Sequence, residues 1–286
     1  MNKFLKLCLA LILSQTIYLN SFAQLRGDTY AEAKAKGTAN WVFTYSEAPG
    51  FAAKVNGKMT GITFDLMHKF KEFVEQKENI RVNITYESSA SNDFILFMKQ
   101  VREGKGGVFG LTSATITEER KKTYTFSPPY ITNISMILSH NSVPTLANVA
   151  DISKIFAGMT AVTVKNSTNE KVLTDIRNKY FPALKIEYVP STRVAMQNVM
   201  KDPKKFTNAD FTYYFEAIQN RQPIKRHPGG DIDTEQFGII MPKSNDWDPL
   251  LEEFMSSEFL ESVYYKKIIA DNLGQSAMKF FETIKH

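Results

Sequence analysis

The stretch Gly110–Tyr130, GLTSATITEERKKTYTFSPPY, gathers four hydroxyl side chains directly before a basic turn. These hydroxyls belong to Thr112, Ser113, Thr115 and Thr117. The spacing Thr115-x-x-Glu118 fits a capping box, and Thr117 suits the N-cap position equally well. The pattern therefore predicts the start of a short helix, where free N–H groups and hydroxyls together favour an anion.

Arg120 would lie in the first turn of this helix, where the helix dipole disfavours a cation. A cation at that place indicates a negative partner, and a small carboxylate suits because a guanidinium can hold it with two parallel hydrogen bonds. The alternative is an ordinary surface arginine in a basic patch with Lys121 and Lys122.

The N-terminus, Met1–Ala23, has the pattern of a secretory signal peptide. A basic start leads into the apolar run Leu5–Leu13, and Ser21-Phe22-Ala23 has the small-x-small form of a cleavage site. The apolar run is too short for a membrane span, and polar residues 14–16 argue against an uncleaved anchor. We expect cleavage after about Ala23 and a periplasmic protein. The single cysteine, Cys8, would be removed with the signal, so no thiol chemistry is expected.

Charge and histidine content exclude several classes of function. The formal net charge is +5, with 35 basic residues spread along the chain and no block of like charge, so nucleic acid is not expected as a partner. The four histidines are scattered without acids or cysteine at metal-ligand spacing, so no metal or other cofactor is expected. These residues are His68, His140, His227 and His286.

Apolar periodicity predicts helices that alternate with strands. The helices are expected over Thr29–Lys36, Ile62–Val74, Asp93–Arg102, Thr168–Tyr180, Thr192–Met200, Pro249–Phe259 and Leu260–Asn272, the last closed by Gly274. The strands are expected over Asn40–Tyr45, Ile80–Tyr86, Gly107–Leu111, Met159–Val164, Ile186–Val189, Asp210–Phe215 and Phe237–Pro242. This alternation predicts an α/β fold with largely parallel sheets, and the length predicts two lobes. Hydroxyl-rich helix starts after strands in both halves predict a ligand cleft between the lobes.

Several short motifs occur in a fixed order. Gly57–Leu66 fits G-x-x-x-G-[FI]-x-x-D-[LI], Thr115–Arg120 fits T-I-T-x-E-R, and Thr125–Tyr130 is similar to F-S-x-P-Y. Tyr30–Gly37 resembles an opening helix with its glycine, and Phe237–Ile239 a returning strand. Over nearly the whole mature chain this order resembles the periplasmic solute-binding proteins of polar amino-acid ABC importers, which have a type II two-lobed fold.

The resemblance implies an architecture and a function. Each lobe would be a mostly parallel sheet flanked by helices, and two hinge crossovers near Asn133 and Phe237 would join them. Lobe 1 would contain residues 24–133 and 237–286, and lobe 2 residues 134–236. The protein would be a monomer without enzymatic activity. It would bind a small carboxylate solute, an amino acid in most of the family, and close over it for an inner-membrane ABC permease.

The resemblance also implies roles for individual residues. Arg120 matches the arginine that clamps the ligand carboxylate, and Thr115 the residue that assists it. Ser113 matches the position whose backbone carbonyl receives the ligand amino group. Ser167 and Thr168 match the helix start of the second lobe that covers the same carboxylate.

Other positions match less closely. Asn166 replaces the usual glycine before that helix, and asparagine is the next most tolerant residue for a left-handed backbone. Phe51 and Glu47 fall near the loop where a side chain packs on the ligand, but Gly50 looks inserted there.

One departure concerns the acid that usually ends a strand of the second lobe and binds the ligand ammonium. Counting from Asp210 puts Phe215 at this position, with Glu216 next. A one-residue bulge would let Glu216 substitute; otherwise it is a solvated residue at a helix start, and the ligand is not a simple α-amino acid. The aromatic run 213–215 is either a stacking wall for a ligand or alternating core and surface.

Two alternative functions remain open on the same fold. Periplasmic cyclohexadienyl dehydratases, which act on prephenate or arogenate, resemble this family. Glu216 would then be the general acid, its pKa raised by the aromatic wall. The other alternative is a soluble sensor that reports the ligand to a receptor. The identity of the ligand is not readable from the sequence.

Overall fold

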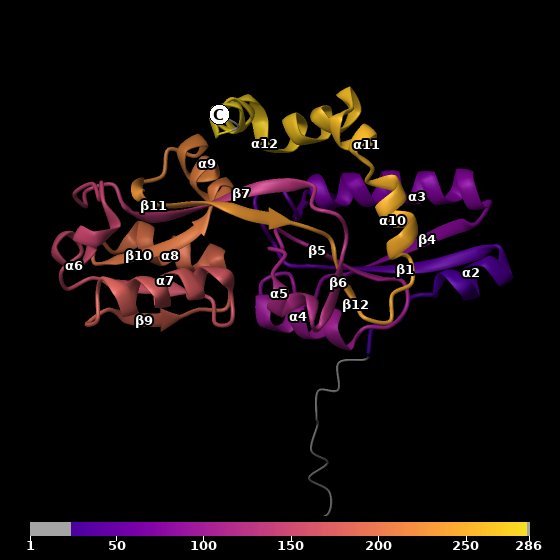
Figure 1. The fold of residues 1–286 in the computed structure, drawn as a ribbon, viewed down its shortest axis with the longest axis horizontal. Helices are drawn as coiled ribbons and strands as arrows, with labels where there is room; N and C mark the ends of the chain where they lie inside the picture. The colour runs from indigo at the N-terminus through magenta and orange to yellow at the C-terminus, as the bar shows by residue number, and fades with distance from the viewer. Residues whose placement is uncertain (1–23, 285–286) are drawn as a thin grey trace, which may run out of the picture.

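The computed structural model describes residues 24–284, without the side chains of residues 233, 234 and 276–284. The expected signal peptide lies outside this range. The chain folds into two lobes that lie side by side, each built on a five-stranded sheet (Figure 1). The α/β two-lobed fold expected from the sequence is confirmed.

The sheet of the first lobe has the strand order β4-β1-β5-β12-β6. Its strands are β1 (Thr38–Tyr45), β4 (Arg81–Glu87), β5 (Val108–Leu111), β6 (Tyr124–Phe126) and β12 (Ile240–Pro242). Only β12 runs against the other strands of this sheet, because it pairs antiparallel with both β5 and β6. Because β1 and β5 are parallel neighbours, with Tyr45 opposite Leu111, the polar residues that follow these two strands lie at the same edge of the sheet.

Helices cover both faces of this sheet, with α3 on one side and α4 on the other (Figure 1). The helices are α2 (Tyr30–Lys36), α3 (Ile62–Glu78), α4 (Phe94–Glu103), α5 (Glu118–Lys121), α10 (Asp248–Phe254) and α11 (Ser257–Glu261), and a hairpin of β2 (Ala53–Val55) and β3 (Lys58–Thr60) stands beside them. The aromatic core centres on Trp41, whose ring lies 5.1 Å from Phe70, 5.1 Å from Phe109 and 5.0 Å from Trp247. These rings bury large apolar areas and hold α3 and the C-terminal segment on the sheet.

The sheet of the second lobe has the order β11-β7-β10-β8-β9. Its strands are β7 (Ile131–His140), β8 (Thr160–Thr163), β9 (Lys185–Tyr188), β10 (Lys205–Asp210) and β11 (Ile224–Phe237). The helices of this lobe are the 3-10 turn η1 (Val149–Asp151), α6 (Ile152–Ile155), α7 (Thr168–Lys179), α8 (Thr192–Lys201) and α9 (Phe211–Gln219). Here β7 is the one antiparallel strand, pairing with β10 and β11 on its two sides.

The chain passes between the two sheets twice, once from β6 into β7 and once from β11 into β12. The long strands β7 and β11 pair with each other along this connection, with Ile131 opposite Phe237 and Asn133 opposite Glu235. Crossovers were expected near Asn133 and Phe237, but neither long strand was predicted from the sequence. Their polar and glycine residues hide the alternation that identifies a half-buried strand.

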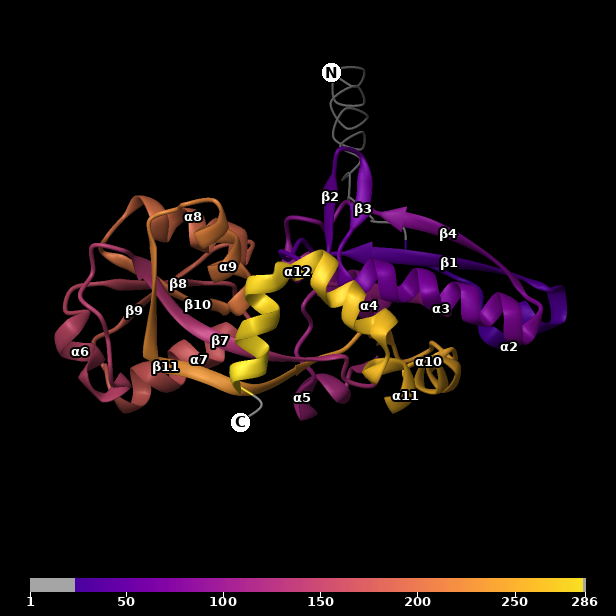
Figure 2. The ribbon, with the colours of Figure 1, turned by 90° about the horizontal axis from the view of Figure 1, so that it is seen from above.

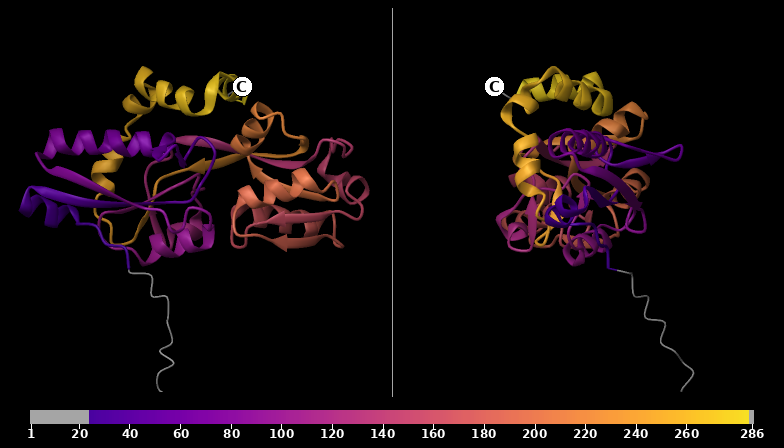
Figure 3. Two further views of the ribbon diagram at one scale, coloured as in Figure 1. Left: turned by 180° about the vertical axis from the view of Figure 1, so that it is seen from behind. Right: turned by 90° about the vertical axis from the view of Figure 1, so that its right-hand side faces the viewer.

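The C-terminal helix α12 (Val263–Ile284) lies across the top of the molecule, above α9 and next to α3 (Figures 2 and 3). The amide of Asn272 anchors it to α3 by donating to Asp65 Oδ2 at 2.7 Å. Gly274 has φ 77° and kinks the helix, but the chain becomes helical again after it. Gly274 thus ends the expected helix, whereas the helical segment that follows it was not predicted. Within residues 24–284, no helix has the length and apolar character needed to cross a membrane.

The prediction of a strand over Asp210–Phe215 is wrong: β10 ends at Asp210, and the next nine residues form α9. Aromatic residues dominate this run and locally favour a strand. Tertiary packing overrides that preference, because α9 buries Phe211, Tyr213 and Ala217 while Ile218 stays exposed. The actual strand, Lys205–Asp210, is nearly all buried although its end is polar, since it pairs with β7 and β8 on its two sides.

Candidate functional site

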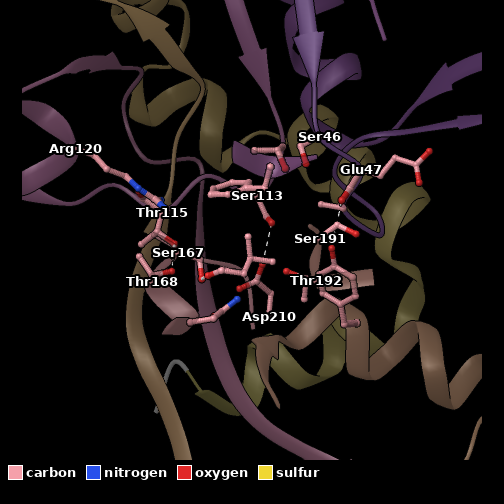
Figure 4. Close-up of a pocket in the computed structure, with 16 residues that line it drawn as sticks. Ser46, Glu47, Ser113, Thr115, Arg120, Ser167, Thr168, Ser191, Thr192 and Asp210 are labelled. Atoms are coloured by element: carbon pink, nitrogen blue, oxygen red, sulfur yellow. Dashed lines mark hydrogen bonds between the residues drawn. The ribbon is translucent and has the colours of Figure 1, made fainter. Parts of the chain in front are cut away.

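A cleft lies between the two lobes (Figure 4). Sixteen residues line it, and half of them carry a hydroxyl other than tyrosine. These hydroxyl residues are Ser46, Thr112, Ser113, Thr115, Ser167, Thr168, Ser191 and Thr192. The charged lining residues are Glu47, Arg120 and Asp210. Such a surface suits a small ligand with several hydrogen-bonding groups.

Arg120 lies at one end of the cleft (Figure 4). Thr117, not Thr115, caps the single turn α5, since its hydroxyl accepts from the Arg120 N–H at 3.1 Å. The guanidinium donates to the carbonyl of Thr115 at 3.0 Å and lies 5.7 Å from the ring centre of Phe94. Burial lowers the pKa of Arg120 while Glu235 opposes this, so the group stays charged. Arg120 therefore faces the cleft, unlike Lys121, which is exposed and pairs with Glu118.

Hydroxyls that follow β5 reach across to the second lobe. The Ser113 hydroxyl donates to Asp210 Oδ2 at 2.8 Å. The hydroxyls of Thr115 and Thr168 lie 3.4 Å apart. The Phe94 N–H donates to the carbonyl of Pro190 in the second lobe at 3.2 Å. The lobes therefore touch in this conformation, and the cleft is closed.

The start of α7 supplies the second lobe's side of the cleft. Asn166 has φ 62°, which confirms the left-handed backbone expected there. Ser167 is the N-cap, accepting from the Glu170 N–H at 3.1 Å, and Thr168 opens the helix. The unpaired N–H groups at the start of a twelve-residue helix carry partial positive charge. Asn169 is buried in the same lining, and its Oδ1 has no hydrogen-bond partner, a feature that the sequence analysis did not single out.

Asp210 is the acid at the end of a strand of the second lobe. It lines the cleft, and only 7% of this residue is exposed to solvent. Its Oδ1 accepts from the Asn133 amide at 3.0 Å, and its Oδ2 from Ser113. Burial, together with the nearby charge of Glu235, raises its pKa to about 7. The strand expected from the sequence begins at Asp210, which displaced this acid from the strand end. In the structure Asp210 is the last residue of β10.

Phe51 and Glu47, both expected near the ligand, lie in different places in the first lobe. Phe51 is fully buried in the core, with its ring 5.2 Å from Phe237, and it does not line the cleft. Glu47 does line the cleft, where its carbonyl accepts from the Tyr213 hydroxyl at 3.3 Å. Its carboxylate points away from Asp210 and lies 3.6 Å from Arg193 Nε on the other lobe (Figure 4).

Phe215 and Glu216 lie on α9, outside the cleft. They line a separate hollow of about 410 Å³ beside the kink of α12. The Glu216 carboxylate accepts from both terminal nitrogens of Arg193, at 3.3 and 3.4 Å. The bulge that would have let Glu216 substitute is absent, because a helix begins at Phe211 and turns this side chain away. The residues 213–215 do not form a stacking wall: Tyr213 alone lines the cleft.

In the described part of the chain, no group of three or more histidine, cysteine, aspartate or glutamate side chains could hold a metal ion. The lining of the cleft combines several kinds of polar group. It offers a cation at one end, a buried acid near the middle, and hydroxyls and helix N–H groups between them. Such a site can hold a small molecule that carries both charges.

Comparison with known families decides the identity of this fold. Residues 42–257 match the bacterial extracellular solute-binding proteins, family 3. The chain belongs to this family. No curated protein matches it by sequence. The cleft of this family 3 solute-binding protein lies within the matched segment, including Arg120, Thr168 and Asp210.

Solved structures share the fold of this family 3 protein. The arginine-, lysine-, histidine-binding protein ArtJ of Geobacillus stearothermophilus is 19% identical, with a TM-score of 0.66 over 82% of this chain and 96% of its own. An ABC uptake transporter substrate-binding protein of Streptococcus pneumoniae with bound histidine is 16% identical, with a TM-score of 0.67 over 87% and 97%. The GluR0 ligand-binding core of Nostoc punctiforme with L-glutamate is 16% identical, with a TM-score of 0.61 over 82% and 99%. At these identities the likeness establishes the fold.

Proposed function

We propose that this protein binds a free amino acid in the cleft between its lobes and delivers it to an ABC importer of the inner membrane. The observation that carries the proposal is the presence of Arg120 and Asp210, opposite charges from different lobes, in the lining of one closed cleft. An amino acid has the complementary pair of charges on neighbouring atoms. The structural neighbours support the same class, since arginine, histidine and glutamate all have this pair.

The ligand carboxylate would lie between Arg120 and the start of α7. Arg120 supplies a planar fork of donors that fits a carboxylate with two parallel bonds. Thr115 and Thr168 meet at 3.4 Å beside it and can turn their hydroxyls to donate. Ser167 and the N-terminal N–H groups of α7 would complete the carboxylate site.

The ligand ammonium would lie against Asp210. In the ionised form this carboxylate attracts a cation strongly, because water is largely excluded around it. Ser113 is close enough to share the ammonium, since its hydroxyl already contacts Asp210. We therefore propose Asp210, rather than Glu216, as the acid that meets the ammonium.

Capture would proceed by a hinge motion. The two connections, from β6 to β7 and from β11 to β12, are the parts of the chain that would bend. Lobe 1 would comprise residues 24–133 and 237–286, and lobe 2 residues 134–236. We propose that the mature protein begins near Gln24, works in the periplasm as a monomer, and presents its closed form to the permease. If the protein delivers the amino acid, a strain that lacks its gene should lose amino-acid uptake. If the protein is only a sensor, uptake should remain intact.

The proposal is tested by thermal unfolding with each of the common L-amino acids. A cognate amino acid at a hundred times its dissociation constant is expected to stabilise the protein by about 2.7 kcal/mol. The matched controls are the amine without the carboxylate and the acid without the amine, both of which should stabilise it far less. Stabilisation by none of the amino acids, or equal stabilisation by a control compound, would contradict the proposal.

A second function, dehydration of prephenate or arogenate, is favoured by one observation. Such a reaction needs a protonated carboxyl in the cleft, and the pKa of Asp210 is raised to about 7. Glu216 lies outside the cleft, so Asp210 would take its place as the general acid. We expect no aromatic product when micromolar protein is incubated with either compound and followed by ultraviolet absorbance. Product that disappears in Asp210→Asn would establish the enzyme instead.

A further inference from the structure

The two long strands that join the lobes carry a buried polar pair next to the cleft. Asn133 on β7 and Glu235 on β11 are direct partners in the strand register. The Asn133 side chain is fully buried, and its Nδ2 donates to Asp210 Oδ1 at 3.0 Å and to Glu235 Oε2 at 2.6 Å. One amide group therefore joins the acid of the cleft to an acid of the hinge strands.

Few groups are available to neutralise these two acids. Arg120 on α5 is the cation that faces both of them, and it also faces Glu119 and Tyr124. The remaining titratable neighbours of Asp210 are Tyr130, before β7, and Tyr213 on α9, which are neutral phenols at pH 7. Thr168 completes the surroundings by a hydrogen bond to Glu235. The site thus holds two carboxyl groups for one guanidinium.

Two carboxyl groups that accept from one amide, with Asp210 buried and Glu235 half-buried, do not ionise independently. Asn133 cannot relieve the repulsion, because an amide contributes hydrogen bonds but no net charge. A proton shared by the pair would reduce its charge to −1, which Arg120 balances. Burial raises the pKa of Asp210 to about 7 and also raises the pKa of Glu235, in agreement with this geometry.

We propose that Asn133 and Glu235 are positioning residues for Asp210, which hold its carboxyl in the cleft and keep one proton on the pair until a cationic group enters. The proton then leaves to solvent and both carboxylates are ionised. The ammonium of the ligand lies against them, while the ligand carboxylate pairs with Arg120 and the partially positive start of α7. The ligand's part in this exchange rests on the proposed function, whereas the shared proton does not. Because both residues lie on the connecting strands, the charge of the cleft depends on the geometry of the hinge.

The ligand-free protein tests the shared proton through thermal unfolding between pH 5 and 8.5. The test variant is Glu235→Gln. The matched control is Glu187→Gln, which removes an exposed carboxylate from β9, the far edge of the same sheet. A folded-state pKa raised above the unfolded value stabilises the protein at low pH, and this stabilisation is lost as the pH rises through about 7. We therefore expect the unfolding midpoint of Glu235→Gln, measured relative to that of wild type, to rise with increasing pH. The difference in midpoint between Glu187→Gln and wild type should stay constant.

Carbon-13 NMR of labelled aspartate carboxyls gives a second measurement that needs only the wild-type fold. The signal that disappears in Asp210→Asn is expected to titrate near pH 7 in wild type and at lower pH in Glu235→Gln. Titration near pH 4 in wild type overturns the proposal, as does a Glu235→Gln offset that does not change with pH. If the titration is found but no amino acid stabilises the protein, the proposed function fails while the shared proton stands.

Discussion

An Arg120→Ala variant is expected to bind the cognate amino acid at least a hundred times more weakly than wild type. The substitution would leave the ligand carboxylate buried without its cationic partner, which typically costs about 3–5 kcal/mol. Each 1.4 kcal/mol corresponds to about a tenfold change in the dissociation constant. No other cation lines the cleft among the described residues, so no neighbour can take its place.

Calorimetric titration with the amino acid found by thermal unfolding measures this effect. Arg120→Lys keeps the charge but loses the planar fork, so it should fall between wild type and Arg120→Ala. Arg102→Ala is the matched control, because Arg102 is exposed on α4 and pairs with the adjacent Glu103. Unchanged affinity in Arg120→Ala would remove this residue from the ligand site.

An Asp210→Asn variant is expected to lose binding while gaining stability. Removal of the carboxylate leaves the ligand ammonium buried and unpaired, which costs about 2–5 kcal/mol of binding free energy. In the ligand-free protein the same change removes a buried acid next to Glu235, while an amide can still bond with Ser113 and Asn133. The unfolding midpoint should therefore match or exceed that of wild type.

The size of the stability gain in Asp210→Asn depends on pH. The pKa of Asp210 is raised to about 7 in the folded protein. This shift stabilises wild type below the pKa of Asp210 in the unfolded chain, and the stabilisation is lost as the pH rises through about 7. The gain in Asp210→Asn should accordingly be largest near pH 8.5 and smallest near pH 5. Equal affinity for the amino acid, or a gain that is largest at acid pH, would contradict the assignment of Asp210.

Much of the site was predictable because its signals are local. Thr115, Thr117 and Arg120 lie within six consecutive positions, and the cap that Thr117 makes needs no contact beyond its own turn. The left-handed Asn166 and the Ser167 cap are likewise set by short-range backbone geometry. Six of the nine predicted site residues line the cleft. These are Glu47, Ser113, Thr115, Arg120, Ser167 and Thr168.

The other three predicted residues were misplaced where local preference and tertiary packing disagree. Phe51 is an aromatic residue in a loop, and only the packed structure shows its ring sealed in the core against Phe237. Phe215 and Glu216 follow a run that locally favours a strand, so the helix that carries them away from the cleft was not foreseen.

The sequence by itself determined the two-lobed α/β architecture, the hydroxyl-rich turn before Arg120 and the helix caps around it, since all of these depend on periodicity and neighbouring residues. Only the tertiary structure decided that Asp210 ends its strand inside the cleft and shares an amide with Glu235. Asp210, Asn133 and Glu235 lie on three different strands, far apart in the chain. The pairing of β7 with β10 and β11 brings them together, and this pairing is driven by the burial of the whole sheet rather than by any pattern around the three residues.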